Sequence, residues 1–490
     1  MERQIRRVGI GLVIALIAVF AQLNYLQIFA AKRIAANPAN IRRLIQEYSV
    51  KRGEIITADG ETVAESKATG GRFKYQRIYP GGDLYAHTVG FYSLVYGSEG
   101  IERSFNDQLL GESRVLSMQD IEDRFLGGGS DGDDVVLTID SVLQQAAKEA
   151  LGEERGAIVA LDPASGAVRA LYSNPSYDPN KLASHDGREV RAFRRTLRPE
   201  SPDSPLKNLA TSQGYPPGST FKVVTGSAAL ESGRYTPRSV FPDPVELELP
   251  LTNQTLMNFT KSSCAGGVEI NLFEAMRVSC DTTFAILGLE VPNEVFETAE
   301  AYGFNERIPF DVVTQPSTFP DVPDEAEPLR AYAAIGQGDT VSTPLQMALV
   351  AAAVANDGEV PRPRLVSEVI DPSGEVAETY PKEVLGRAIL PETAAQIKEM
   401  MVAVVASGTG TAAAIPGVEV AGKTGTAQTG VEGENPHTWF ICFAPASRPR
   451  LAVAVIVENG GSFGSEATGG AVAAPLAKRI LEVDRSIRRW

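Results

Sequence analysis

Histidine and cysteine are both scarce in this chain of 490 residues, which contains three of each. Three cysteines exclude a disulfide-rich scaffold, and they exclude a structural zinc site, which needs four ligands at regular spacing. The three histidines, His87, His185 and His437, are scattered and lack clustered carboxylates, so no metal centre is expected. The shortage of histidine also disfavours a Ser-His-Asp hydrolase, although spacing alone does not exclude one.

Positive charge is also in deficit, because 46 lysines and arginines face 61 acidic residues and leave a net charge of −15. Binding to a phosphate backbone requires a basic face, so nucleic acid is not an expected partner. The arginines between Arg188 and Arg198 are a local exception, which we interpret as a solvated or loop-clamping cluster. The length itself predicts two or three structural units.

Charged residues are missing altogether from Val8 to Ala31. As a helix this stretch would span about 36 Å, against a hydrocarbon core of about 30 Å. Arginines at positions 3, 6 and 7 precede it, which predicts a cytoplasmic N-terminus. The sequence therefore predicts a short cytoplasmic tail (residues 1–7), a transmembrane anchor (8–31) and an extracytoplasmic remainder, as in a single-pass protein of the plasma membrane.

A cleaved signal peptide is the alternative to an anchor, since Ala30-Ala31 could host processing. Its apolar region would normally have about 7–15 residues, fewer than are present here, so we favour the anchor. Polar residues at Gln22, Asn24 and Gln27 interrupt the second half of the stretch. Such residues in a span often face a partner helix.

The most informative segment reads Tyr-Pro-Pro-Gly-Ser-Thr-Phe-Lys-Val-Val-Thr from Tyr215 to Thr225. Ser219 and Lys222 are three positions apart, so in a helix the hydroxyl and the amine share one face. The prolines and glycine before Ser219 place it at or near a helix start, where backbone N–H groups and the positive end of the helix dipole point. A serine beside a lysine base, at a site that can stabilise an oxyanion, is suited to acyl transfer.

This spacing is weak evidence alone, because a serine at a helix start commonly serves only as a cap. A second copy, Ser204-Pro-Leu-Lys207, is rejected, since the prolines at 202 and 205 disfavour a helix there. Ser219 instead leads into an apolar helical pattern that continues to Leu230 and predicts a helix buried under a sheet.

Two further motifs strengthen the interpretation. Lys423-Thr424-Gly425-Thr426 offers a cation and two hydroxyls for a substrate carboxylate, and its glycine permits a close backbone approach. Ser279-Cys280-Asp281 supplies another hydroxyl after a helical pattern. Ser-x-Asp is common, and two other copies occur in the chain. In this order, however, the three motifs resemble the signature of penicillin-binding proteins and class A β-lactamases.

The chain as a whole resembles the class B penicillin-binding proteins, most closely their actinobacterial members. The resemblance covers nearly the full length and rests on motifs at Arg52–Ile55, Asp59-Gly60, Gly100–Phe105, Val136–Asp140, Ala157–Pro163, Pro175–Asn180, Ile335–Gly338 and Thr343–Gln346. It implies an α+β chain with the penicillin-recognising serine transferase fold, which is a five-stranded antiparallel sheet flanked by helices plus an all-α subdomain. A β-rich pedestal (residues 32–150) would precede the transpeptidase domain (151–490).

The residue patterns agree with that fold class. Apolar runs at Gly156–Asp162 and Ala167–Ser173 predict a hairpin, and runs at Thr438–Phe443 and Leu451–Val457 predict a second pair of strands. The chain closes with a predicted helix over 472–488. The glycine-rich stretch 460–470 is predicted as a loop that flanks the cleft.

The resemblance implies a role for each motif residue. Ser219 would be the nucleophile, Lys222 its base and Ser279 a proton relay, and Lys423 would shape the electrostatics with the substrate-binding residues Thr424, Gly425 and Thr426. The expected substrates are peptidoglycan stem peptides and their lipid-linked precursors, with β-lactams as inhibitors and no cofactor. A membrane glycan polymerase of the shape, elongation, division and sporulation family would be the partner.

Asp281 departs from the family pattern, which usually has asparagine there. An amide can donate a hydrogen bond to a substrate carbonyl and an ionised carboxylate cannot. A carboxylate would also raise the pKa of Lys222, which disfavours the neutral base. We therefore expect Asp281 to be protonated, or to point at Lys222 and slow acylation.

The cysteines support one further prediction. An extracytoplasmic location permits oxidation, and Cys264 and Cys280 are predicted to form a disulfide at the edge of the active site. Cys442 lies in a strand-like run and is predicted to be a buried, small hydrophobic residue.

Alternative functions share the same residues. A D,D-carboxypeptidase would pass the acyl group to water, and the sequence barely separates it from a D,D-transpeptidase. A β-lactamase is disfavoured by the anchor and the long pedestal. A weakly catalytic scaffold or sensor for a glycan polymerase is the alternative of a different class, and the intact Ser219–Lys222 pair argues against it.

Overall fold

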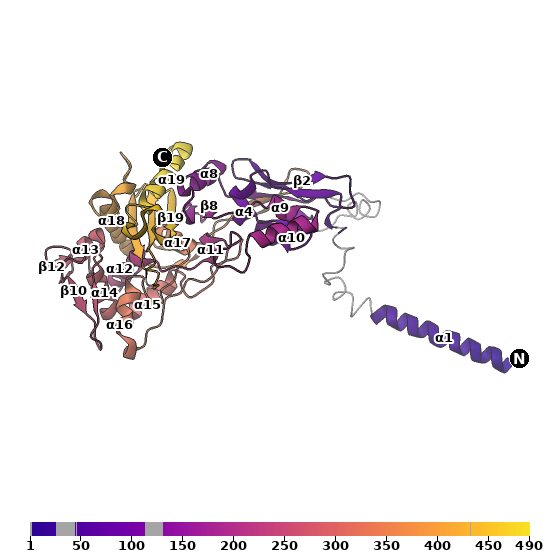
Figure 1. Cartoon of the computed structure of the whole chain (residues 1–490), viewed down its shortest axis with the longest axis horizontal. Coiled ribbons are helices and arrows are strands. Elements are labelled where there is room, and N and C mark those ends of the chain that lie inside the picture. The colour runs from indigo at the N-terminus through magenta and orange to yellow at the C-terminus, as the bar shows by residue number, and fades with distance from the viewer. Residues whose placement is uncertain (1, 26–44, 46, 113–130, 432) are drawn as a thin grey trace.

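The computed structural model describes residues 2–25, 45, 47–112, 131–431 and 433–490 (Figure 1). Helix α1 (Glu2–Asn24) is, within these residues, the one helix long and apolar enough to cross a membrane. It begins several residues earlier than the predicted span, in the arginine-containing segment. The last part of the predicted anchor, residues 26–31 with Gln27, lies outside the described residues.

A five-stranded antiparallel sheet forms the centre of the catalytic part, in the order β17-β18-β19-β7-β8. Every residue of β7 and β19 is buried, which agrees with their continuous apolar runs. Both predicted strand pairs are present, because β7 pairs with β8 and β18 pairs with β19. The bounds are β7 Gly156–Leu161, β8 Val168–Asn174, β17 Ala421–Ala427, β18 His437–Ala444 and β19 Leu451–Val457.

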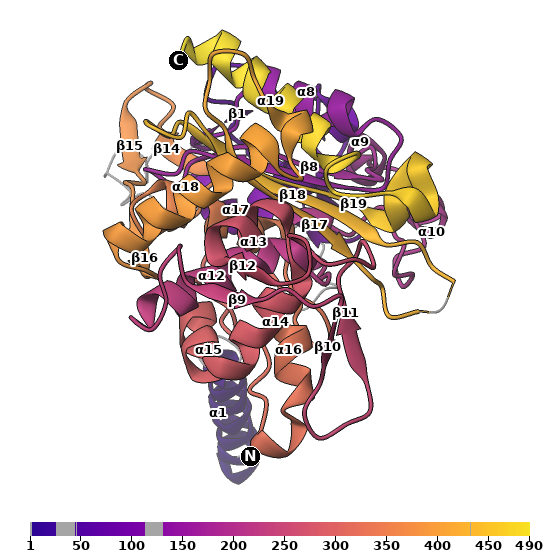
Figure 2. The same cartoon turned by 90° about the vertical axis from the view of Figure 1, so that its left-hand side faces the viewer.

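Helices cover both faces of this sheet (Figure 2). On one face, α8 and α19 pack against residues such as Ile158 and Val453; on the other, α17 packs against residues such as Val159 and Ala454. Neighbouring strand residues thus serve two separate cores, as strand geometry requires. The bounds are α8 Ser141–Leu151, α12 Lys222–Glu231, α17 Pro344–Ala355 and α19 Ala473–Arg488, so the predicted C-terminal helix is present.

Local sequence explains where these helices begin. Asp140 accepts a hydrogen bond from the Leu143 amide at 3.0 Å and caps α8, while Thr343 accepts one from Gln346 at 3.2 Å and caps α17. Pro344 occupies the first turn of α17, where its missing N–H costs nothing. All twelve residues of α17 are buried, so this helix is the central element under the sheet.

A six-stranded sheet, in the order β15-β14-β6-β1-β2-β3, forms the pedestal. Its core contains a buried charge cluster in which Glu102 accepts hydrogen bonds from Arg52 at 2.6 Å and from Arg77 at 2.5 Å. The strands are β1 Ile55–Ile56, β2 Thr62–Ala68, β3 Tyr75–Ile78, β6 Asp134–Leu137, β14 Val366–Ile370 and β15 Val376–Thr379. Two strands therefore come from far beyond the predicted boundary at residue 150, and this hairpin joins the pedestal to the catalytic part.

A helical subdomain lies beside the catalytic sheet, at the lower left of Figure 1. It contains α13 (Leu272–Val278), α14 (Asp281–Glu290), α15 (Pro292–Ala301) and α16 (Pro328–Ala334), together with the short hairpin of β10 (Glu246–Glu248) and β11 (Thr255–Met257). Helix α18 (Pro391–Ser407) packs between this subdomain and β17. The arrangement is the predicted α+β fold, but the subdomain is mainly helical rather than all-α, because it includes the hairpin of β10 and β11.

Candidate active site

Ser219 lies in a 3-10 turn, η3 (Gly218–Phe221), that runs directly into α12. Gly218 has a φ of +54°, and its amide donates a hydrogen bond to the carbonyl of Gly336 at 2.9 Å. A Cβ on Gly336 would lie 2.2 Å from the Gly218 oxygen, so only glycine permits this approach. The Ile335–Gly338 motif thus supports the turn that carries the serine.

Lys222, one helical turn after Ser219, is fully buried. Its Nζ donates to Asp281 Oδ1 at 2.6 Å, to the Ser279 carbonyl at 2.8 Å and weakly to Ser279 Oγ at 3.4 Å. Burial lowers the pKa of Lys222, and the nearby Asp281 carboxylate opposes this only in part. Of the two predicted states of Asp281, the structure has the one in which its carboxylate points at Lys222.

The Ser-x-Asp motif joins two helices. Ser279 ends α13 with φ 63° and ψ 44°, a left-handed conformation that is uncommon for serine. Asp281 is the first residue of α14. The sharp change of direction at Ser279 brings its hydroxyl and the Asp281 carboxylate to the same lysine, and such strained residues often occur at functional sites.

Lys423 lies on β17, the edge strand nearest the serine turn, and is also fully buried. Its Nζ donates to Ser279 Oγ at 2.7 Å and to the Thr424 carbonyl at 2.9 Å. Burial, together with the charge of Lys222, lowers the pKa of Lys423 well below its usual range, against the pull of Asp281. The Ser279 hydroxyl therefore lies between two buried amines, which brings all three motifs together.

Gly425 allows β17 to lie against the serine turn. A Cβ at this position would be 2.9 Å from the Pro217 oxygen and 3.0 Å from Thr220 Cγ2. On its other side, Gly469 approaches so closely that a Cβ there would lie 2.4 Å from the Gly425 oxygen. The Gly469 amide also donates to Thr426 Oγ1 at 3.3 Å. The predicted loop at 460–470 thus reaches the Lys-Thr-Gly-Thr strand. It contains short 3-10 turns, η6 (Glu458–Glu466), which are interrupted by positive φ angles at Asn459, Gly460, Gly461 and Gly464.

Contacts that sequence reasoning missed surround Asp281. Asn258 Oδ1 accepts from the amides of Asp281 at 3.0 Å and Thr282 at 3.1 Å, which caps α14 from a distant segment. The Phe259 amide donates to Asp281 Oδ2 at 2.9 Å. The predicted disulfide between Cys264 and Cys280 is present and ties this segment to the motif. No local pattern signals a cap supplied by a residue more than twenty positions away.

The serine turn is held from its other end as well. Tyr215 donates its hydroxyl to Glu458 Oε1 at 2.6 Å, and Arg155 donates to Glu458 Oε2 at 2.6 Å. The indole of Trp439 donates to the Pro216 carbonyl at 3.0 Å. These bonds fix the Tyr-Pro-Pro segment to β18 and to the end of β19, so Ser219 sits on a braced turn. Thr424 and Thr409 share a hydrogen bond of 2.6 Å between their hydroxyls.

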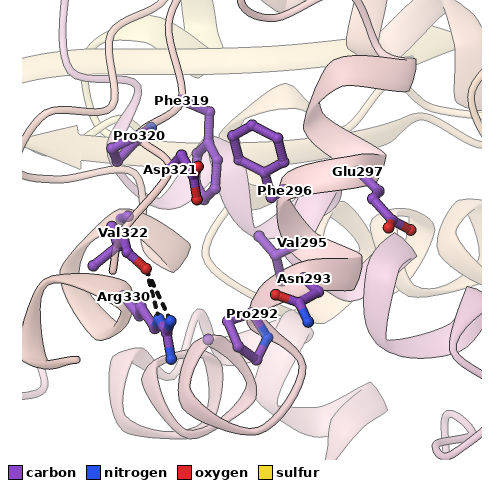
Figure 3. A pocket seen from close by; sticks show the side chains of 12 residues that line it. Pro292, Asn293, Val295, Phe296, Glu297, Phe319, Pro320, Asp321, Val322 and Arg330 are labelled. Atoms are coloured by element: carbon purple, nitrogen blue, oxygen red, sulfur yellow. Dashed lines mark hydrogen bonds between the residues drawn. The ribbon is translucent and has the colours of Figure 1, made fainter. Parts of the chain in front are cut away.

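A cavity of about 150 Å³ lies apart from these groups, between α15, α16 and the segment Phe319–Val322 (Figure 3). Phe296 and Phe319 form its apolar wall, and Arg330 closes one end through hydrogen bonds to the Val322 carbonyl. The ring of Phe319 stacks on Phe221 at 5.0 Å, so this cavity lies behind the serine turn. It contains none of the predicted site residues.

The fold and the site together define a class of protein: a serine acyltransferase with a buried lysine one helical turn after the serine. The family model of the penicillin binding protein transpeptidase domain matches residues 156–482. The family model of the penicillin binding protein A dimerisation domain matches residues 52–135. The chain belongs to the penicillin-binding protein family of transpeptidases.

Proteins similar to this chain match it over nearly its full length. The peptidoglycan D,D-transpeptidase PbpA of Mycolicibacterium smegmatis is 41% identical over 98% of both chains. The protein of the same name from Mycobacterium tuberculosis is 39% identical over 98% of this chain and 99% of its own. Among solved structures, the ceftriaxone acyl-enzyme complex of penicillin-binding protein A from M. tuberculosis has 39% identity and a TM-score of 0.84, covering 90% of this chain and 99% of that chain. The penicillin G acyl-enzyme complex of that protein has 38% identity and a TM-score of 0.82, covering 89% and 99%.

Proposed function

We propose that this protein is a peptidoglycan D,D-transpeptidase that cross-links stem peptides through an acyl-enzyme on Ser219. The observation that carries the proposal is the meeting of three motifs at one hydroxyl, since Lys222 and Lys423 both donate to Ser279 Oγ. Relatives named peptidoglycan D,D-transpeptidase and relatives solved as β-lactam acyl-enzymes support the same reaction.

In the first half-reaction, Ser219 Oγ attacks the carbonyl of the penultimate D-alanine and its proton passes to Lys222. Burial favours the neutral amine that this step needs. The bond to the terminal D-alanine then breaks, and Ser279 relays a proton to the leaving amine. The backbone N–H groups of Ser219 and Thr426 form the oxyanion hole, where the loss of one donor costs about 3–4 kcal/mol in known cases.

In the second half-reaction, the amine of a neighbouring stem peptide attacks the acyl-enzyme and frees Ser219. Thr424, Thr426 and Lys423 hold the substrate carboxylate, while Gly425 lets the substrate backbone lie along the edge strand β17. Because β17 is at the edge of the five-stranded sheet, an extended peptide can add to it as a further strand. No cofactor takes part in these steps.

The protein would be anchored in the plasma membrane by α1, with the catalytic part outside the cytoplasm. The arginines before the apolar segment support this orientation. A membrane glycan polymerase of the shape, elongation, division and sporulation family is the proposed partner, and the polar residues Gln22 and Asn24 on α1 are candidates for contact with it.

A donor peptide ending in D-alanyl-D-alanine, supplied together with an amine acceptor, tests the proposal. We expect mass spectrometry to detect free D-alanine and the donor–acceptor conjugate with wild-type protein and neither product with Ser219→Ala. Hydrolysed donor without conjugate would identify a carboxypeptidase instead. Absence of both products would favour the scaffold function.

A further inference from the structure

A second cavity, of about 270 Å³, lies where the pedestal meets the catalytic part. One side is formed by α4 (Ala86–Val89) and the segment Glu99–Arg103, and the other by the segment Leu206–Asn208 and Ser212, at the end of α11 (Leu209–Ser212). Both helices are labelled near the middle of Figure 1. None of the proposed catalytic residues lines this junction cleft.

Three charged side chains line the junction cleft: Glu99, Arg103 and Lys207. Within the described residues, none of the three forms an ion pair within 4.0 Å or a side-chain hydrogen bond, although Glu99 lies in the electrostatic field of Arg103. Glu99 and Arg103 are exposed and Lys207 is half-buried, and the positive charges of Arg194 and Arg103 act on the Glu99 carboxylate. Arg194 does not line the cleft, and its guanidinium lies over the ring of Tyr96 at 4.4 Å.

The neutral polar groups of the cleft are, by contrast, already used by the protein. His87 Nε2 is 2.8 Å from the Pro205 carbonyl, and the Asn208 amide donates to the His87 carbonyl at 3.2 Å. Ser212 donates its hydroxyl to the Val313 carbonyl at 3.2 Å. The groups available to a ligand are therefore one carboxylate and two cations, set in a wall that also contains apolar residues.

We propose that the junction cleft is a binding site for a small zwitterionic amino acid, whose ammonium group pairs with Glu99 and whose carboxylate pairs with Arg103 and Lys207. Charged hydrogen bonds of this kind are the stronger ones, and the guanidinium of an arginine suits a carboxylate well. The cavity has room for a molecule of this size, and Leu206, Val312 and Val313 offer contacts for a short apolar side chain. D-alanine is our first choice of ligand, and only this choice rests on the proposed function, which releases it.

Binding can be measured by ligand-detected NMR on the full-length protein in detergent, with D-alanine as the probe. Propionate and ethylamine each keep one of its two charged groups, so we expect each to bind at least about tenfold more weakly. Glu99→Gln and Lys207→Gln should each weaken D-alanine binding by about tenfold. Arg238→Gln, at an exposed arginine outside the cleft, should leave it unchanged.

The proposal would be overturned by the absence of saturable D-alanine binding, or by equal binding of propionate and D-alanine. Competition by benzylpenicillin would also overturn it, because D-alanine would then occupy the catalytic cleft. Ser219→Ala should bind D-alanine normally while it loses the penicillin adduct. Failure of the junction site and failure of the proposed catalysis are thus separate results.

Discussion

Asp281 Oδ1 lies 2.6 Å from Nζ of Lys222, the residue proposed as the general base. The two charges attract each other, but Lys222 is fully buried and burial has the larger effect on its pKa, which is lowered. The carboxylate is itself held by the Phe259 amide. Asp281 therefore limits how far burial can favour the neutral amine.

Asp281→Asn removes the charge that raises the pKa of Lys222, so this pKa should fall further. A lower pKa gives more neutral amine at a given pH, and each unit of the fall increases the neutral fraction about tenfold below the pKa. The rate of acylation by benzylpenicillin should therefore stay high to lower pH in the variant. Glu325→Gln, at an exposed carboxylate in the same subdomain, should match wild type. Identical pH profiles for Asp281→Asn and wild type would refute this role of Asp281.

Gly425→Ala should lower the rate of acylation without unfolding the protein. The added Cβ would press on the Pro217 oxygen and on Thr220, which shifts β17 away from the serine turn. A displacement of about 1 Å can cost about 100-fold in rate, so we expect acylation to slow by that order while the protein stays folded. Gly386→Ala places its Cβ in open space on β16 (Val384–Arg387) and serves as the control. Normal acylation by Gly425→Ala would show that close contact of β17 with the turn is not required.

Asn258→Ala removes the acceptor that caps α14. It leaves the amides of Asp281 and Thr282 without their partner, which should cost about 1–3 kcal/mol of unfolding free energy. Acylation should slow as well, because the same bonds fix the start of α14 and with it the Ser279 hydroxyl between Lys222 and Lys423. Asp186→Ala removes the cap of α10 (Gly187–Thr196), remote from the motifs, and should cost about 0.5–2 kcal/mol without slowing acylation. Equal acylation rates in the two variants would contradict the positioning role of Asn258.

Glu102→Gln tests the buried charge cluster of the pedestal. Loss of the carboxylate leaves Arg52 and Arg77 uncompensated in the core, which should cost about 3–5 kcal/mol in chemical denaturation. Although burial raises the pKa of Glu102, the two arginines outweigh it and lower the pKa below its usual value. Wild-type protein should therefore lose this contribution as the pH falls through the lowered pKa, and the variant should not.

Glu65→Gln is the control for that experiment, because Glu65 pairs with Lys67 at 3.1 Å on the surface. An exposed pair of this kind contributes less than about 1 kcal/mol. A similar loss of stability in both variants would show that the buried cluster contributes no more to stability than an exposed ion pair.

The sequence predicted those elements whose determinants are local. Strands β7, β18 and β19 are continuous apolar runs, and the spacing of Ser219 and Lys222 is a property of a single helix turn. Even the orientation of Asp281 was one of two expected states, because carboxylates and amines attract each other at any site. These features required no knowledge of distant contacts.

Other features depend on segments that meet only in the folded chain. Val369 of β14 pairs with Val135 of β6, which extends the pedestal sheet beyond the expected boundary. Asn258 caps a helix that begins more than twenty residues later, and Ser279 adopts a left-handed conformation because two helices meet there. No periodicity or spacing in the sequence encodes such contacts. The limits of the pedestal sheet and the residues that position Asp281 could therefore be identified only in the structure.

The most direct test of the account is the intact mass of the full-length protein with and without benzylpenicillin. We expect a long-lived adduct of one penicillin mass on wild type and on Ser204→Ala, whose serine belongs to the rejected Ser-x-x-Lys copy. Ser219→Ala should form no adduct. An adduct that persists in Ser219→Ala, or no adduct on wild type with the penicillin left intact, would contradict the assignment of Ser219 as the acylated nucleophile.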